Sequence, residues 1–370
     1  ELHNYGEQSV DLSGACLTDN PKKPMRWRIP AVSLAPDGYL VIFLSGKDRS
    51  DANAPLHSNY ALKGKGDYLG LFASDGITVI HEYAPYPRQK RDISYGLLAA
   101  WRESPENAKQ FFGEPSPGAP NGDLIAGVAG GVKFSVKRGW HAKPFRLSLR
   151  TKTEGSQIRY TLDGTKPKEN SGRLYGSPLT ITSTTTLRAT AFKPGFKPST
   201  PTTRTFLFVN DIIRQSPDGL PPESFPYNWG ENKVDYGMDS RIVDDPRYSK
   251  ELIAGFRSLP SFSVVMNLDD LFERENGIYA NAEWDGRESE RPCSVEFIQH
   301  DGTKGFQIDC GIRIRGGFSR RTYNPKHSFR LFFRDAYGPS KLDFPLFGNA
   351  GARTFDNFDL RTFQNYSWHI

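Results

Sequence analysis

Four cationic residues lie around a glycine pair in the C-terminal third of the chain. They are Arg313, Arg315, Lys326 and Arg330, and the pair is Gly316-Gly317. If the flanking strands pair, these like charges crowd one surface, so an anion is expected beside them. Guanidinium and ammonium groups next to a glycine loop are suited to holding phosphate. A sheet face whose cations pair with carboxylates from elsewhere explains the same residues. On the residues alone this second interpretation is favoured, because a single basic glycine loop is weak evidence.

Two strands must position these cations. Within residues 306–334, apolar and polar residues alternate with a period of two, which puts successive side chains on opposite faces of a sheet. The first strand is expected to bury Phe306, Ile308, Cys310, Ile312 and Ile314. On one face of the next strand we expect His327, Phe329, Leu331 and Phe333. Its other face then carries Lys326, Ser328, Arg330 and Arg334, with Phe332 among them.

A second hairpin is predicted just before this one. Asp301-Gly302 is a preferred centre of a two-residue type I′ turn. That turn sets Cys293 opposite Cys310, so a cross-strand disulfide is possible if the geometry permits. Two buried free thiols are equally consistent with the sequence. A disulfide would indicate an oxidising compartment. The three cysteines form no Cys-x-x-Cys motif and no histidines cluster, so no metal site is assigned.

Composition bounds the rest of the chain. A length of 370 residues, with 35 Gly, 27 Pro and 13% aromatic residues, favours several β-rich domains. Between residues 133 and 204 we count fifteen Lys or Arg against three acidic residues, so this segment is strongly basic. Nucleic acid is one partner for such a segment, but cationic strand faces exposed to solvent are the favoured explanation. No apolar run predicts a membrane span, and no secretory signal is visible. The chain begins at Glu1 without Met, as a fragment or processed product would.

Residues 1–123 are expected to form a β-sandwich, because short strand-like segments recur between turns. Motifs of a known family lie along this segment: Val10-Asp11-Leu12-Ser13-Gly14, Gly38-Tyr39-Leu40-Val41, His57-Ser58-Asn59-Tyr60, Ser94-Tyr95-Gly96 and Pro117-Gly118-Ala119-Pro120-Asn121. With them the segment resembles the lamin tail domain, an immunoglobulin-like (Ig-like) sandwich. That resemblance implies an accessory or interaction module, so no site is assigned here.

Residues 124–132 form an apolar, glycine-rich linker, and a second β unit is predicted over residues 133–209. Its signature is Ile158-Arg159-Tyr160-Thr161-Leu162-Asp163-Gly164-Thr165, followed by Ser177-Pro178-Leu179 and Thr186-Leu187-Arg188-Ala189. The unit resembles the Ig-like domain at the C-terminal ends of chitobiases and hexosaminidases, which implies a spacer or a carbohydrate-associated module. Trp140 and Tyr175 are candidates for stacking on sugar, although packing is the favoured role of single aromatic residues at strand edges.

Residues 210–370 change to an α+β pattern, with helices expected at residues 246–256, capped by Asp245, and at residues 268–272. The segment contains motifs of another family: Tyr236-Gly237-Met238-Asp239, Asn276-Gly277-Ile278-Tyr279, Glu290-Arg291-Pro292-Cys293, Gly311-Ile312-Arg313-Ile314-Arg315-Gly316-Gly317, Asn324-Pro325-Lys326-His327 and Asn365-Tyr366-Ser367-Trp368. It resembles the CotH kinase family, which has an atypical kinase-like fold. Members transfer phosphate from ATP to serine of secreted or surface proteins.

This resemblance implies roles for individual residues. Lys326 would hold ATP phosphates, and Glu290 or Glu296 would orient it. The covering loop would consist of Arg315, Gly316, Gly317, Ser319 and Arg320. ATP and Mg are expected for the complete kinase domain. The family's catalytic and magnesium-binding aspartates lie downstream of Trp368, so this chain holds no assigned catalytic or metal residue and is expected not to phosphorylate by itself.

Together these observations predict a mainly β protein. Two Ig-like β-sandwiches, at residues 1–123 and 133–209, precede an incomplete α+β kinase-like N-terminal lobe at residues 210–370. The resemblances imply an extracellular or cell-surface bacterial kinase with a protein substrate on the cell surface, and with polysaccharide as a further partner. A surface adhesion or scaffold protein, whose CotH-like domain is only structural, is the alternative. The sequence does not indicate the phosphoacceptor, the glycan or the oligomeric state.

Overall fold

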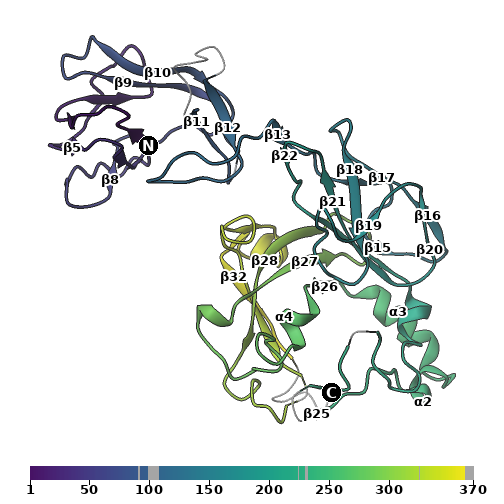
Figure 1. Cartoon of the computed structure of the whole chain (residues 1–370). Helices are drawn as coiled ribbons and strands as arrows, with labels where there is room; N and C mark the ends of the chain where they lie inside the picture. The colour runs from purple at the N-terminus through teal and green to yellow at the C-terminus, as the bar shows by residue number, and fades with distance from the viewer. Residues whose placement is uncertain (91, 99–107, 224, 230–231, 325, 363–370) are drawn as a thin grey trace. The chain divides into compact units, whose positions relative to one another are not determined.

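The computed structural model describes residues 1–90, 92–98, 108–223, 225–229, 232–324 and 326–362 (Figure 1). The chain is mainly β, as predicted, and is built from many small sheets. It divides into two compact units, one of residues 1–128 with 194–197 and one of residues 129–193 with 198–370. Across the described residues, no helix has the length and apolar character needed to cross a membrane.

The first unit is a set of short strands around a four-stranded sheet ordered β10-β9-β3-β4. Its strands are β1 (Leu2–His3), β2 (Val10–Asp11), β3 (Cys16–Thr18), β4 (Trp27–Arg28), β5 (Ser33–Leu34), β6 (Tyr39–Leu40), β7 (Ile42–Phe43), β8 (Leu56–His57), β9 (Asp67–Phe72), β10 (Val79–Tyr86), β11 (Ser94–Leu97), β12 (Lys109–Phe112), β13 (Gly127–Val128) and β22 (Phe196–Lys197). Parallel pairing joins β13 to β22. Part of the predicted linker therefore belongs to a strand pair of this unit.

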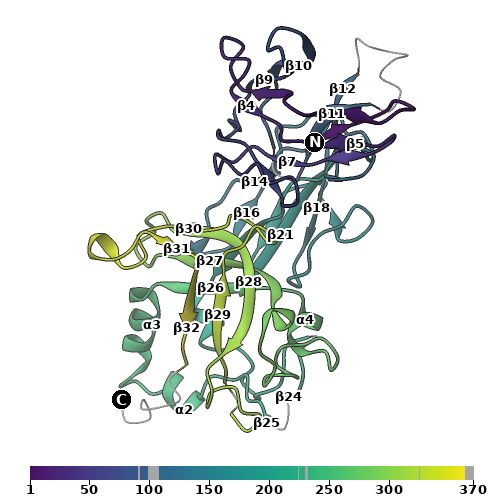
Figure 2. The ribbon, with the colours of Figure 1, turned by 90° about the vertical axis from the view of Figure 1, so that its left-hand side faces the viewer.

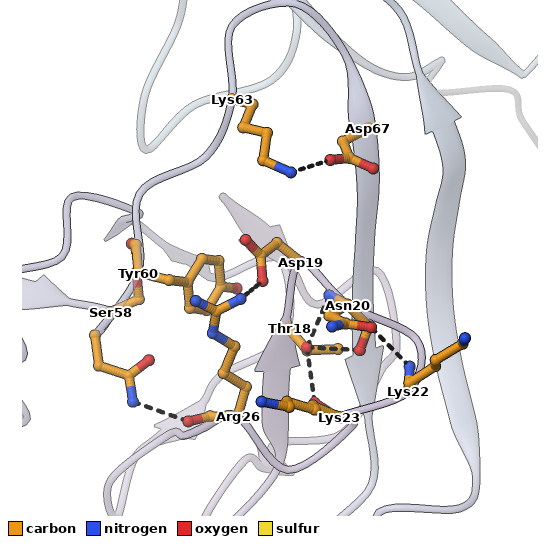
Figure 3. Close-up of polar contacts among 11 residues, drawn as sticks. Thr18, Asp19, Asn20, Lys22, Lys23, Arg26, Ser58, Tyr60, Lys63 and Asp67 are labelled. Atoms are coloured by element: carbon orange, nitrogen blue, oxygen red, sulfur yellow. Dashed lines mark hydrogen bonds and ion pairs between the residues drawn. The ribbon is translucent and has the colours of Figure 1, made fainter.

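Polar contacts hold the connection between β3 and β4 in place (Figure 3). The Thr18 hydroxyl donates to the backbone oxygen of Lys23 at 2.8 Å. Arg26 forms an ion pair with Asp19, and its guanidinium lies 4.8 Å from the centre of the Tyr60 ring. The charge of Arg26 is thus balanced locally, which fits a structural role for these residues.

The second unit begins with a small sandwich. Its strands are β14 (Lys133–Phe134), β15 (Gly139–Trp140), β16 (Phe145–Leu147), β17 (Leu149–Arg150), β18 (Gln157–Thr161), β19 (Arg173–Leu174), β20 (Leu179–Ile181), β21 (Thr185–Phe192) and β23 (Thr202–Leu207). A five-stranded sheet, ordered β15-β23-β21-β18-β19, packs over the pairs β14-β17 and β16-β20. Leu147, Leu187, Ala189 and Phe206 are fully buried between the layers.

The rest of the second unit is the α+β part. Its elements are α1 (Val209–Ile212), β24 (Asn228–Trp229), β25 (Asn232–Lys233), α2 (Ser240–Val243), α3 (Ser249–Ser258), β26 (Ser261–Val265), α4 (Leu268–Phe272), η2 (Arg287–Ser289), β27 (Arg291–Ile298), β28 (Phe306–Arg315), β29 (Ser328–Phe332), β30 (Leu342–Asp343), η3 (Gly348–Ala350), β31 (Thr354–Phe355) and β32 (Asn357–Leu360). Five of the strands form an antiparallel sheet ordered β26-β27-β28-β29-β32. Figure 2 shows these strands side by side, with β28 as the long curved one.

Both predicted helices exist, but one starts later than expected. The second, α4, has the predicted bounds, and Asn267 caps it. The first, α3, begins at Ser249, because residues 246–248 form a turn on Asp245. The Asp245 carboxylate accepts a hydrogen bond from the Arg247 N–H at 2.8 Å. It therefore stabilises the turn before α3, and the N-cap residue of α3 is Tyr248 and not Asp245 as predicted.

The register of the cysteine hairpin is as predicted, although its turn is not. Cys293 lies opposite Cys310, and Phe297 opposite Phe306. Asp301 does not have the positive φ that a type I′ turn requires of both central residues. Gly302 does, with φ +72°, and its N–H donates to the backbone oxygen of Gln299. The strands therefore separate earlier and close through a wider turn.

Both cysteines of this hairpin are free thiols in the structure. Their sulfur atoms are 3.5 Å apart and buried. Burial, together with the contact to Cys310, raises the pKa of the Cys293 thiol well above its usual range. Of the two arrangements that the sequence left open, the structure contains the free thiols.

Candidate functional site

The two strands predicted to carry the cations do pair. β28 and β29 are antiparallel, with Arg313 opposite Arg330 and Arg315 opposite Ser328. The predicted apolar face is confirmed, because Ile308, Cys310, Ile312 and Ile314 are buried in one core. The arginines therefore gather on the other face and at the end of the hairpin, as the alternation requires.

Asp359 on β32 is the carboxylate that the crowded arginines meet. It lies directly across from Arg330, which donates to both of its oxygens at 2.5 and 2.9 Å. The Nε atom of Arg315 approaches the same carboxylate more loosely, at 3.5 Å. The bidentate hydrogen bonds from Arg330 hold the pKa of Asp359 below its usual range. Two guanidiniums thus share one carboxylate, which leaves an excess of positive charge.

Glu290 plays the same part for the other arginines of this face. Its carboxylate lies 2.9 Å from Arg334 and 3.6 Å from Arg313. The guanidiniums of both arginines also lie over the ring of Phe332, at 4.8 and 4.1 Å from its centre. Glu290 therefore organises an arginine pair, which is a different contact from the one to Lys326 that the family resemblance implies.

A loop held by several hydrogen bonds follows β28. Gly316 has φ +107°, and a Cβ atom there would collide with the hydroxyl of Ser319. That hydroxyl donates to the Arg315 carbonyl at 2.7 Å. Arg320 donates to four backbone carbonyls: those of Ile314, Gly316, Glu283 and Trp284. The structure thus assigns Arg320 and Ser319 to holding the loop in shape.

The loop returns to the sheet through His327. This ring is buried, its Nδ1 lies 2.6 Å from the backbone oxygen of Ser319, and burial lowers its pKa. Lys326, just before it, is exposed, and β29 begins only at Ser328. Lys326 therefore stands on the loop two residues ahead of the strand. Gly317 is also exposed, and nothing lies near the position of its missing Cβ. Arg315, Gly316, Gly317, Ser319, Arg320 and Lys326 are all part of one connection.

Glu296, the other predicted partner of Lys326, lies on β27 and faces the sandwich. Its carboxylate is fully buried, 3.2 Å from Arg138 and 3.9 Å from Arg204. Burial raises its pKa in spite of these two cations. Arg138 also donates to the backbone oxygen of Phe306, and Thr205 and Ser263 share a hydrogen bond of 2.7 Å. Glu296 therefore joins the sandwich to the sheet.

This contact also uses part of the basic segment. Besides Arg138 and Arg204, Arg188 is buried and donates to the Gly164 carbonyl at 2.9 Å. These three cations point into the unit, so the positive charge available to an outside partner is smaller than the sequence suggests.

The candidate sugar-stacking residues are both half-buried. Tyr175 packs against the sandwich core. The indole N–H of Trp140 on β15 is buried and has no hydrogen-bond partner. Packing, the favoured interpretation of both residues, is confirmed for Tyr175.

Residues 365–368, which end the CotH resemblance, lie outside the described residues. Within the described ranges, no group of three or more His, Cys, Asp or Glu side chains is placed to hold a metal ion. Sequence reasoning did not identify Asp359 as the carboxylate that pairs with Arg315 and Arg330, nor Arg138 and Arg204 as the partners of Glu296. A strand-like pattern at residues 357–360 was the one available signal for Asp359.

Comparison with known proteins identifies one part of the chain. Residues 137–204 match the family model of the chitobiase/beta-hexosaminidase C-terminal domain. The predicted resemblance of the second β unit is therefore confirmed over these residues. The match covers a small part of the chain, so it describes this domain alone. No curated protein sequence matches the chain significantly.

Proposed function

We propose that residues 210–370 form the nucleotide-side part of an extracellular bacterial protein kinase of the CotH type, with ATP phosphates held at the loop after β28. One observation carries the proposal: Arg315 and Arg330 share the single carboxylate of Asp359 beside this loop. An excess positive charge therefore lies at the loop end of the hairpin. An anionic group of the ligand would balance it.

The individual roles follow from the contacts. Arg315 is about half exposed (47%) and, with five N–H donors, can bind a phosphate oxygen while it stays near Asp359. Lys326 brings an ammonium group to the same loop, and Gly317 leaves space for the approach of a ligand. Ser319 and Arg320 keep the loop in the required shape. In the complete kinase, Mg would supply positive charge that stabilises the transferred phosphate, and serine of a surface protein would accept it.

Thermal melting of the 370-residue chain with ATP and Mg tests this function. A saturating ligand that binds only the folded chain raises its stability by about 2.7 kcal/mol at a hundredfold excess over Kd. We expect Lys326→Ala to abolish the shift. Lys304→Ala is the matched control, because this exposed lysine lies at the other end of β28, about 30 Å away along ten residues of strand. An unchanged melting temperature with ATP would favour the alternative, a surface scaffold whose CotH-like domain is structural.

The match of residues 137–204 favours a second function, association with polysaccharide. Retention of the chain on insoluble chitin tests it. Because Tyr175 packs into the core, any retention must depend on other residues, and Tyr175→Phe should leave it unchanged. Elution of the chain from a chitin column without delay would contradict this function.

A further inference from the structure

The loop between β28 and β29 displays two aromatic rings to solvent. Phe318 is 56% exposed and Tyr323 is 59% exposed. Their ring centres are 6.0 Å apart, and the ring planes meet at 69°. In each of the other ring pairs formed by the described residues, at least one ring is less than half exposed. Exposed apolar surface that is gathered in one place marks an interaction site more often than scattered single residues do.

Hydrogen bonds also hold the loop backbone that carries the two rings. The backbone oxygen of Phe318 accepts from the side-chain amide of Asn324 at 2.6 Å and from the N–H of Arg321 at 3.2 Å. The N–H of Asn324 in turn donates to the Arg321 carbonyl at 2.9 Å. Arg320 ties the same segment to Ile314 and Gly316 on the strand side. The backbone that carries the aromatic pair is therefore preorganised, which lowers the conformational entropy that ligand binding must remove.

The pair lies close to the cations of the proposed phosphate site. Phe318 follows Arg315 by three residues, and Tyr323 precedes Lys326 by three. Three residues span at most about 11 Å, so each ring is anchored within that distance of one cation. Arg315 and Ser328 are opposite each other across the two strands, so both arms of the loop start from the same place.

We propose that Phe318 and Tyr323 form a stacking platform for the base of the nucleotide whose phosphates lie at Arg315 and Lys326. The inference rests on the proposed function. It adds a binding site for the base, which the cations cannot recognise. Aromatic rings stack on any nucleobase, because every base has a π face. The platform therefore selects nucleotides over free polyphosphate, with little preference between purines.

Calorimetric titration of the 370-residue chain with ATP, GTP and inorganic tripolyphosphate, each with Mg, tests the platform. We expect ATP and GTP to bind with similar affinity, about 5- to 150-fold more tightly than tripolyphosphate, as stacking of one base provides. Phe318→Ala and Tyr323→Ala should weaken ATP binding and leave tripolyphosphate binding unchanged. Phe318→Tyr keeps a ring and should keep the preference. Phe347→Ala removes another exposed ring (68%), outside this loop, and serves as the control.

The outcomes separate the two proposals. Equal affinity of the native chain for ATP and tripolyphosphate, with Lys326→Ala weakening both, would overturn the aromatic platform and support the phosphate site. The platform would also be overturned if Phe318→Ala lowers the affinity for ATP and the affinity for tripolyphosphate by the same factor. If the native chain binds neither tripolyphosphate nor ATP, both the phosphate site and the platform are refuted.

Discussion

Arg138→Met should destabilise the second unit in a pH-dependent way. The change removes the nearer of the two cations around Glu296, at 3.2 Å, and leaves Arg204 at 3.9 Å. At an effective dielectric constant of about 20, these distances correspond to attractions of roughly 5 and 4 kcal/mol. Because desolvation of a buried carboxylate costs several kcal/mol, Arg204 alone does not compensate for it.

Protonation of Glu296 limits the stability that Arg138→Met can lose, because the neutral carboxyl no longer needs a cation beside it. From its ordinary pKa of 4.5, protonating this carboxyl at pH 7 costs about 3 kcal/mol, at about 1.4 kcal/mol per pH unit. At pH 5 the same step costs only about 0.7 kcal/mol. Loss of the hydrogen bond from Arg138 to the Phe306 carbonyl adds about 1 kcal/mol at either pH. We therefore expect a destabilisation of roughly 2–4 kcal/mol at pH 7 and roughly 1–2 kcal/mol at pH 5.

The sign follows from linkage. A carboxyl whose pKa is raised by folding contributes stability below its unfolded pKa, and this contribution is lost as the pH rises through the folded value. Removing Arg138 raises the folded pKa of Glu296 further, so the variant should lose stability between pH 5 and pH 7 compared with the native chain. The double variant Arg138→Met with Glu296→Gln has no carboxyl to titrate at position 296. Its own stability should therefore not fall between pH 5 and pH 7 through this site, in contrast to the single variant.

Urea unfolding at the two pH values, followed by fluorescence, measures these differences. Arg146→Met is the control, because it removes an exposed arginine from β16 of the same sandwich. An equal cost of Arg138→Met at pH 5 and pH 7 would refute the reasoning, as would a double variant that is no more stable than the single one. Either result would mean that the charge of Glu296 is satisfied without Arg138.

Three further predictions concern the hairpin and the thiols. Asp359→Asn should cost about 1 kcal/mol at neutral pH, since the ion pair is only partly buried. Because folding lowers the pKa of Asp359, this stability is lost as the pH falls through the folded value, so urea unfolding of native and variant chains should converge in acid; convergence at high pH instead would contradict it. Gly316→Ala should lower stability by about 1–2 kcal/mol in a thermal melt, since φ is +107° there and the new Cβ meets Ser319; an unchanged melt would show that the loop adapts. Thiol titration should find three thiols per chain in denaturant and slow reaction in the native state, since all three cysteines are buried and free; one thiol in denaturant would instead reveal a Cys293–Cys310 disulfide.

Local pattern was sufficient for the strands β27, β28 and β29 of the second unit. The period of two along residues 306–314 identified the buried face of β28, because successive side chains of a strand must point to opposite sides. The register that sets Cys293 opposite Cys310 also followed from the sequence, because the strand pattern and the turn position limit the possible pairings. The turn type was wrong, since Asp301 keeps a negative φ and only Gly302 takes the left-handed conformation. The buried face and the register of these strands could thus be predicted from the sequence, whereas the type of the turn between them could not.

The sequence by itself therefore determined that the segments of β27, β28 and β29 are strands, which face of β28 is buried and that the arginines share one surface. Only the tertiary structure decided which carboxylate balances each arginine. Asp359 reaches Arg330 because β32 is the neighbour of β29, and Glu296 meets Arg138 because the sandwich packs on β27. Alternation is a property of one strand and can be read locally. Charge pairing between residues up to 158 positions apart, as for Arg138 and Glu296, depends on which distant segments the fold brings within a few ångströms.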